Sequence, residues 1–228
     1  MLKIDRKDPL YLQVYEQLKQ HILSQNWKPG EKVIESKIAA ELKLSRSPVR
    51  EALRILEHEG LLTKKDQNLY IYHPSVEDII ELYQLRYSLE ALSCYLAAEA
   101  ANEEELAYLK EIILMTESAL EKGNKQEIYE WNTLFHETII GASKNKHLIT
   151  VMDSLQAKVL YCRNVLVQFD YMRVDSFIQE HIAIYESIRE QKKEEAKRLM
   201  ETHIQKDLDR IIALFPNQTL TGGLRHEN

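Results

Sequence analysis

Three arginines stand four residues apart, at Arg46, Arg50 and Arg54. Side chains at this spacing lie on one side of an α-helix, so the three would form a basic stripe. Guanidinium groups donate hydrogen bonds in a fork that matches a phosphate or the edge of a guanine. The stripe could therefore contact DNA, although such a charge pattern is also common on the solvated face of an ordinary helix.

A second set of side chains has the chemistry of a metal site. His136, His181 and His203 each stand among apolar residues at helical spacing, which predicts that each ring points into a core. Asn132 precedes His136 by four residues and would share its helical face. Imidazoles that meet inside a helical bundle can bind a divalent first-row cation. The alternative is three separate core histidines, each satisfied by a hydrogen bond.

The arginine stripe lies on a segment with the signals of a short helix. Ser45 or Ser47 can cap its first turn, and Pro48 is tolerated there because the first N–H groups have no helical partner. Gly60 would end the helix. The residues expected to face a core are Val49, Ala52, Leu53 and Leu56.

A shorter amphipathic helix is expected just before it, over residues 35–42. Only Lys43 and Leu44 stand between that segment and Ser45. Two short helices joined by a tight turn form a helix-turn-helix unit, which places its second helix in the major groove of DNA.

These residues resemble the winged helix-turn-helix of the GntR family of bacterial transcription regulators. The resemblance covers about residues 8–74 and rests on Lys28-Pro29-Gly30-Glu31, on Ser45–Leu53 and on Glu59-Gly60-Leu61. It implies a three-helix unit with a β-hairpin wing over residues 61–72. The residues that it implies for DNA contact are Ser45, Arg46, Ser47, Pro48, Arg50, Arg54, Lys64 and Lys65.

The predicted wing departs from the family at its tip. Asp66-Gln67-Asn68 stand where glycine is usual, and Asn68 could supply the positive φ that a tight turn needs. A close approach of this tip to DNA is less secure, so Lys64 and Lys65 are the better candidates for phosphate contacts.

Charge is divided unevenly along the 228 residues. Residues 1–75 carry 13 Lys and Arg against 10 Asp and Glu, a net charge of +3, whereas residues 76–228 carry 17 against 26, a net charge of −9. The basic excess thus coincides with the arginine stripe, as expected for a DNA-binding module joined to an acidic partner domain.

The bulk composition is that of an ordinary globular protein, with 44% hydrophobic and 29% charged residues. No apolar run approaches the roughly 18 residues that span a bilayer, and the N-terminus has no signal-peptide pattern. Cys94 and Cys162 match no metal or redox spacing. We therefore expect a cytoplasmic protein that does not contact a membrane.

The rest of the chain is predicted to be an all-α, antiparallel helical bundle. No proline occurs between Pro74 and Pro216, and the apolar periodicity is helical throughout. Ser75 and Asp78 have the spacing of a capping box. We expect helices near 76–100, 103–122, 125–142, 146–166, 172–190 and 193–214. The predicted domains are 1–74 and 75–216, followed by a tail over 217–228.

This region resembles the FCD ligand-binding domain of the FadR-type subfamily, over roughly residues 78–214. The segments that carry the resemblance are Arg86–Glu90, Leu134-Phe135-His136 and Glu180-His181. It implies one divalent ion, zinc first and nickel or manganese as alternatives, bound by Asn132, His136, His181 and His203. Asparagine stands where aspartate is common, so the site lacks a formal charge and should bind its ion more weakly.

The same resemblance implies a small organic acid as effector. Arg86 is the first candidate for its carboxylate, because a guanidinium fork suits that group, and Arg163 is a weaker one. Arg86 could instead pair with Glu90, four residues later. An effector site without a metal is a further alternative.

Together these features predict a mainly α, ligand-responsive DNA-binding regulator. The resemblance implies that it binds a palindromic double-stranded operator as a homodimer. It also implies a repressor, because repressors are more common than activators in this family. One rival is a metal-dependent enzyme such as a hydrolase, but the chain has no His-Glu-x-x-His motif. The other rival is a helical interaction module without a role on DNA, whose behaviour toward DNA would not depend on salt.

Overall fold

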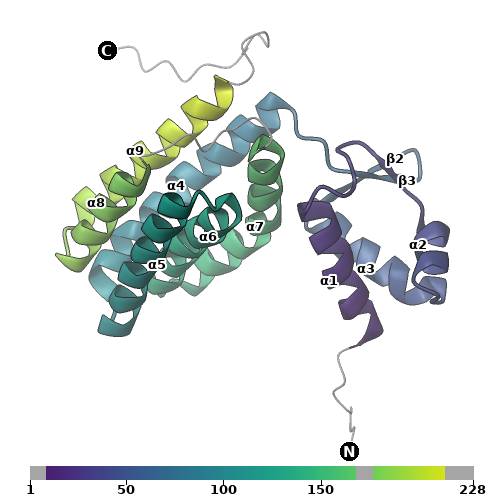
Figure 1. Ribbon diagram of the computed structural model, residues 1–228, viewed down its shortest axis with the longest axis horizontal. Helices are drawn as coiled ribbons and strands as arrows, with labels where there is room; N and C mark the ends of the chain where they lie inside the picture. The colour runs from purple at the N-terminus through teal and green to yellow at the C-terminus, as the bar shows by residue number, and fades with distance from the viewer. Residues whose placement is uncertain (1–8, 168–176, 214–228) are drawn as a thin grey trace, which may run out of the picture. The chain divides into compact units, whose positions relative to one another are not determined.

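The computed structural model describes residues 9–167 and 177–213, without the side chains of residues 163–167. Helices predominate in these ranges, and the strands lie in the N-terminal part (Figure 1). The described residues form two compact units, one of 9–74 with 154–167 and the other of 75–153 with 177–213. The predicted fold class, a winged helix-turn-helix followed by an all-α region, is confirmed.

Together with the second part of α7 (Lys146–Val167), three helices from the N-terminal part of the chain lie in the first unit: α1 (Leu10–Leu23), α2 (Glu35–Glu41) and α3 (Arg46–His58). Each buries the apolar face that its periodicity predicts. The buried residues of α3 are Val49, Ala52, Leu53 and Leu56, and those of α1 are Val14, Tyr15, Leu18 and Ile22. These faces share one core with Ile38 and Ala39 of α2, which fixes α3 against α1 and α2.

The turn between α2 and α3 is closed by backbone hydrogen bonds. The N–H of Leu44 donates to the carbonyl of Ala39 (2.9 Å) and the N–H of Lys43 to that of Ala40 (3.2 Å), the pattern of a Schellman motif. Lys43 takes a positive φ of 54°, a conformation that usually selects glycine. Ser45 occupies the N-cap position of α3 but makes no capping hydrogen bond through its side chain. The expected hydroxyl cap at this helix is therefore wrong.

The wing is part of a three-stranded antiparallel sheet in the order β1-β3-β2, with β1 (Lys32–Val33), β2 (Leu62–Lys65) and β3 (Asn68–Ile71). Strand β1 is an addition to the predicted hairpin. Lys65 pairs with Asn68, so Asp66 and Gln67 form the two-residue turn, with φ values of 47° and 65°. Both central residues have φ > 0, as in a type I′ turn. The expectation that Asn68 supplies the positive φ is wrong, because Asn68 already belongs to β3 and its amide donates to the carbonyl of Asp66.

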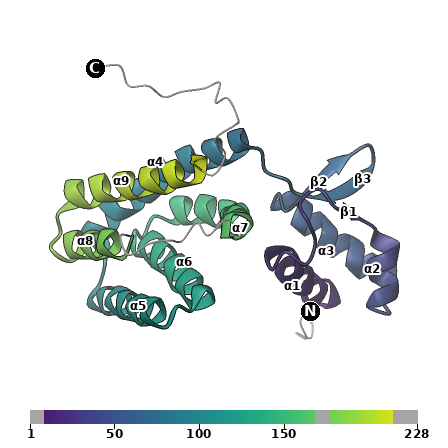
Figure 2. The ribbon, with the colours of Figure 1, turned by 45° about the horizontal axis from the view of Figure 1, so that its top comes forward.

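The second unit is helical throughout its described residues. Its helices are α4 (Val76–Ala100), α5 (Glu103–Lys122), α6 (Lys125–Ala142), the first part of α7 (Lys146–Val167), α8 (Phe177–Arg189) and α9 (Lys193–Ile212). Apart from the start of α8, their ends lie within two residues of the predicted ones. The start predicted for α8 over 172–176 and the tail 217–228 lie outside the described residues. Helices α4 and α9 run side by side, with α8 next to α9 (Figure 2).

Local signals set the ends of these helices. Ser75 and Asp78 form the predicted capping box, in which the N–H of Asp78 donates to Oγ of Ser75 (3.0 Å) and the N–H of Ser75 donates to the Asp78 carboxylate (2.9 Å). Helix α5 ends at Gly123, which has a φ of 63°. Within the described ranges, no helix combines the length and the apolar character needed to cross a membrane.

Candidate DNA-binding surface and metal centre

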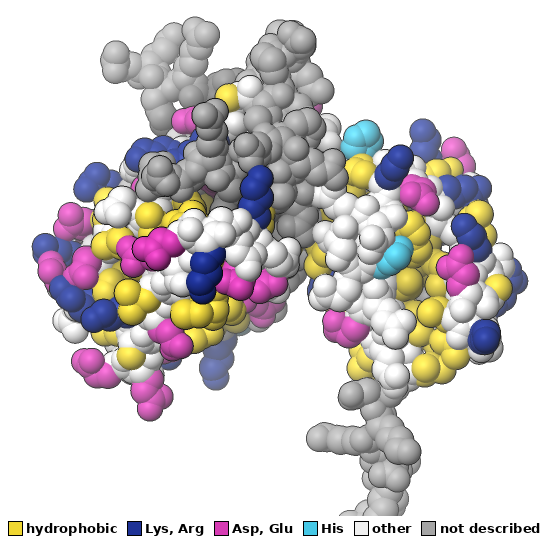
Figure 3. Space-filling view, viewed as in Figure 1, with side chains coloured by type: hydrophobic (Ala, Val, Ile, Leu, Met, Phe, Trp, Pro, Cys, Tyr) yellow, Lys and Arg dark blue, Asp and Glu magenta, His cyan; other side chains and the backbone are white. Residues whose placement is uncertain are grey.

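The residues predicted to contact DNA lie on one helix and on the wing. The side chains of Ser45, Arg46, Ser47, Arg50, Arg54, Lys64 and Lys65 are exposed, and Pro48 is half-buried. The exposure of the three arginines follows from the burial of the opposite face of α3, which turns the arginine stripe outward. Basic side chains over α2 and the wing are interspersed with acidic ones (Figure 3). The surface is therefore mixed in charge, although its unit carries a basic excess.

One acidic residue of this surface, Glu35, was not predicted. It is the first residue of α2, and its carboxylate accepts two hydrogen bonds from Arg50, from Nε (3.0 Å) and from Nη2 (2.9 Å). Nε of Arg46 lies 3.6 Å from the same carboxylate, and Arg54 pairs with Glu51 at 3.1 Å. Glu35 and Arg50 are fifteen positions apart, so only the packing of α2 on α3 brings them together.

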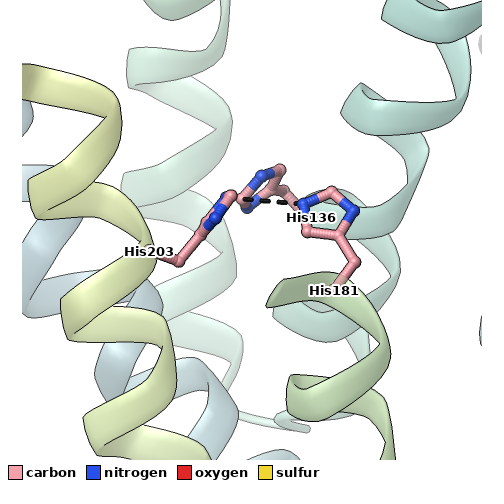
Figure 4. Close-up of side chains that lie close together, drawn as sticks. All are labelled: His136, His181 and His203. Carbon is pink, nitrogen blue, oxygen red and sulfur yellow. Dashed lines mark hydrogen bonds between the residues drawn. The ribbon is translucent and has the colours of Figure 1, made fainter. Parts of the chain in front are cut away.

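The three predicted histidines converge inside the helical unit (Figure 4). His136 comes from α6, His181 from α8 and His203 from α9, and all three are buried. One ring nitrogen of each lies within 4.8 Å of the others, and Nε2 of His181 is 3.4 Å from Nε2 of His203. Phe135 stacks on His181 with ring centroids 3.9 Å apart, which holds that ring in place.

Two carboxylates contact the outer nitrogens of this cluster. Nδ1 of His203 lies 2.7 Å from Oε2 of Glu180, and Nδ1 of His136 lies 2.5 Å from Oε2 of Glu90. An ionised carboxylate can only accept a hydrogen bond, so Glu180 favours the tautomer of His203 that carries its proton on Nδ1 and has a lone pair on Nε2. The nitrogens left to face the centre of the cluster are then the ones that can bind a cation.

The charges around His203 support this arrangement. Burial lowers the pKa of His203 below its usual value, against the opposing effect of Glu180, and so favours the neutral ring that ligates metals. Burial alone would raise the pKa of Glu180, but hydrogen bonds from His203 and Lys206 and the charge of Arg210 outweigh it and lower that pKa to about 2. Glu180 is therefore ionised at neutral pH.

The separation between two of the three rings fits a zinc-like ion. Two nitrogens bound to one tetrahedral zinc, each at about 2.0–2.1 Å, stand about 3.3 Å apart. The separation of 3.4 Å between His181 and His203 matches this value. Asn132 lies one turn before His136 on α6 and is only 9% exposed, so it occupies the same buried face. The described residues thus offer three imidazoles, with one neutral oxygen donor nearby.

Arg86 lies in the core of the same unit with none of its surface exposed. Its Nε donates to Oε1 of Glu90 (2.7 Å), so the pairing of these two residues four apart does occur. Nη1 is 3.5 Å from Oδ2 of Asp207. Burial lowers the pKa of Arg86, but Glu90, Tyr83 and Asp207 together raise it above the usual value, so the guanidinium is charged.

Glu90 therefore stands between Arg86 and His136, with one carboxylate oxygen toward each. Nη1 and Nη2 of Arg86 are buried, and neither donates a hydrogen bond to an acceptor among the described residues. Such a charged, incompletely satisfied fork is suited to an incoming carboxylate. The side chain of Arg163, the second effector candidate, lies outside the described residues.

Sequence reasoning missed Glu90 and Glu180 as partners of the histidines. Glu180 stands beside His181 in the sequence, yet it contacts His203, which is on another helix. Glu90 was considered only for its spacing to Arg86. Neither contact has a signal in the sequence, because both depend on how α4, α6, α8 and α9 pack.

Comparisons with known proteins agree with these features. Residues 10–68 match the family of bacterial regulatory proteins called gntR, and residues 81–206 match the FCD domain. The chain is 36% identical to the uncharacterized HTH-type transcriptional regulator YdhC of Bacillus subtilis (strain 168), over 92% of this chain and 94% of that protein. It is 29% identical to the gluconate operon transcriptional repressor of the same organism, over 67% of this chain and 68% of that one.

The fold agrees as well. The solved structure of Escherichia coli McbR/YncC superposes with a TM-score of 0.76 at 24% sequence identity, and the match covers 92% of this chain and all of that one. The relatives and both family models are those of transcription regulators, so the enzyme alternative is set aside. The chain belongs to the GntR family of bacterial transcription regulators, in the group that carries an FCD domain.

Proposed function

We propose that this regulator is a homodimeric repressor whose helical unit binds a divalent cation, zinc first, together with a small organic acid. Two copies of α3 would enter successive major grooves of a palindromic operator, with Arg46 and Arg50 on bases or phosphates and Ser45 and Ser47 on phosphates. Arg54, Lys64 and Lys65 would add phosphate contacts, and Pro48 would shape the start of the helix. Acting on bacterial DNA, the protein would work in the cytoplasm.

The observation that carries the metal part of this proposal is the convergence of His136, His181 and His203 in a buried core. Buried polar atoms are nearly always satisfied, and here Glu180 already accepts a hydrogen bond from Nδ1 of His203, while Glu90 lies 2.5 Å from Nδ1 of His136. A cation bound to the inner nitrogens would satisfy all three rings at once. The bound ion would supply a Lewis-acidic position for an anionic ligand.

The effector part rests on Arg86. Its buried Nη1 and Nη2 could receive a carboxylate close to the histidine centre, since Glu90 joins Arg86 to His136. The repressor part is supported by the gluconate operon repressor among the relatives. Binding of the acid would favour one arrangement of the dimer and so change operator affinity, which is a coupling between two distinct sites.

Metal titration by calorimetry tests the central step. Apo protein prepared with a chelator is titrated with zinc, nickel and manganese, and we expect one ion per chain for the preferred metal. His181→Ala should abolish tight binding, whereas His147→Ala, which removes an exposed histidine of α7, should not change it. Asn132→Asp should tighten binding, because it adds a charged ligand. Equal affinities of the wild type and His181→Ala would contradict the proposal.

A further inference from the structure

The carboxylate of Glu35 occupies the fork of Arg50, one of the arginines through which the protein would read DNA. Both contacts are short, 3.0 Å to Nε and 2.9 Å to Nη2, and form a bidentate pair. The side chain of Arg50 is 52% exposed and that of Glu35 is 26% exposed, so the pair lies on the surface rather than in the core.

This pair changes what Arg50 can do. The edge formed by Nε and Nη2 cannot grip a phosphate or a guanine while Glu35 holds it, which leaves Nη1 and the second proton of Nη2. A hydrogen bond from Arg50 lowers the pKa of Glu35, so the carboxylate is charged at neutral pH. Glu35 also lies near Arg46, at 3.6 Å, and its negative charge reduces the attraction of both arginines for any phosphate.

Those effects bear on specificity more than on overall affinity. Contacts to phosphates attract all DNA sequences alike, whereas contacts to bases distinguish them. A long arginine side chain that is free can reach whichever phosphate is nearest. One that is held by a neighbouring carboxylate presents fixed donors, and it loses less conformational freedom when it binds.

We propose that Glu35 is the positioning residue for Arg50 and thereby a determinant of operator specificity: it suppresses indiscriminate phosphate contacts and fixes the donors that Arg50 presents. This inference rests on the proposed role of α3 in DNA recognition. The proposal goes beyond that role because it assigns a function to Glu35, an acidic residue of α2. Glu35 would not contact DNA itself and would act only by positioning Arg50.

The test begins with the intact wild-type protein and a pool of random-sequence duplexes, from which its preferred site is enriched. Fluorescence anisotropy then compares the enriched duplex with a shuffled duplex for wild type, Glu35→Gln and Glu51→Gln. The Glu51 variant is the matched control, because it removes the same charge from α3 but frees Arg54 instead of Arg50.

We expect Glu35→Gln to reduce the ratio of the two affinities about tenfold, a size typical of one good base contact. Most of the loss should come from tighter binding to the shuffled duplex, with a logarithmic salt slope steeper by about one for each added phosphate contact. Glu51→Gln should raise both affinities in parallel and keep the ratio. Glu35→Asp retains the charge but withdraws the carboxylate, and it should also lose discrimination.

Two further measurements separate positioning from a general effect on folding. Thermal unfolding of each variant is followed by circular dichroism, and the midpoints should stay close to that of the wild type. In an Arg50→Ala background, Glu35→Gln should cause no further loss of discrimination. The proposal would be overturned if Glu35→Gln and Glu51→Gln had the same ratio of affinities for the enriched and shuffled duplexes. It would also be overturned if the losses of discrimination caused by Glu35→Gln and Arg50→Ala were additive. A wild type that enriches no sequence would instead overturn DNA reading by α3 itself.

Discussion

Nδ1 of His203 lies 2.7 Å from Oε2 of Glu180, and this contact orders one side of the histidine centre. Glu180 also accepts hydrogen bonds from Lys206 (3.0 Å) and Arg210 (3.3 Å), which hold the carboxylate against α9. With Nδ1 of His203 engaged, Nε2 faces His181 across 3.4 Å. The orientation of one proposed metal ligand, His203, is thus set by Glu180, which contacts the imidazole from the side away from His181.

Glu180→Gln should weaken zinc binding by about 10- to 100-fold, the usual cost of losing a carboxylate behind a metal-bound histidine. Glutamine keeps the shape of the side chain but removes the charge that raises the basicity of the ring. Competition with a zinc-binding dye measures the effect. Glu186→Gln, a change at a half-buried position of the same helix that does not contact the histidines, should bind zinc like the wild type. Equal affinities for both variants would contradict a supporting role for Glu180.

The free energy of unfolding at acid pH should depend on the carboxylate of Glu180. The pKa of Glu180 is about 2 in the folded protein against an ordinary value of 4.5, so the unfolded chain binds more protons between these values. Its contribution is complete above about pH 4.5 and is lost as the pH falls toward 2. After allowance for solvent screening, we expect the wild type to lose about 1–2 kcal/mol more than Glu180→Gln over this interval. Urea unfolding in pH steps measures the difference, and parallel curves would contradict it.

Arg50→Ala should weaken binding to the enriched duplex by about 1–3 kcal/mol if Arg50 reads a base. The substitution also leaves Glu35 with only the 3.6 Å contact to Arg46, so more of its negative charge would repel nearby phosphates. Arg198→Ala is the control, because it removes the same charge from an exposed position on α9. Anisotropy at fixed salt measures both, and an unchanged affinity for Arg50→Ala would exclude base reading by this residue.

Replacing either of two glycines by alanine should change the stability of the protein, in opposite directions for the two positions. A Cβ at Gly123 or at Gly141 would meet no atom within 4 Å, so sterics with neighbours do not distinguish them. Gly123 has a φ of 63°, where an L-residue is strained, and Gly123→Ala should destabilise the protein by about 1 kcal/mol. Gly141 lies within α6, and Gly141→Ala should stabilise it by about 0.5–1 kcal/mol. Chemical denaturation measures both; shifts of the same sign would contradict the argument.

Features encoded in neighbouring residues were predictable from the sequence. The capping box of Ser75 and Asp78, the apolar face of α3 and the inward histidines all follow from spacings within one helix, which helical geometry converts directly into position. The family resemblance supplied what spacing could not, namely that the three histidines share one site.

Features that depend on packing between elements were not predictable. Glu35 and Arg50 are brought together by the α2–α3 turn, and β1 forms only because β3 offers it a free edge. The wing turn was misassigned by one residue because Asp66 and Gln67, neither of them a glycine, accept positive φ values within the hairpin register. The missing hydroxyl cap of Ser45 has a similar origin, since the Schellman turn fixes the approach of the chain to α3.

The most direct test of the account is the affinity for the enriched duplex, measured by anisotropy at two salt concentrations, before and after removal of bound metal and again after zinc is restored. If the histidine centre is coupled to DNA binding, this affinity should change about fivefold or more when the metal is removed, and restored zinc should reverse the change. His181→Ala should show no response to either treatment. An affinity that stays the same in the wild type, with metal removal verified by elemental analysis, would contradict a metal centre that controls DNA binding.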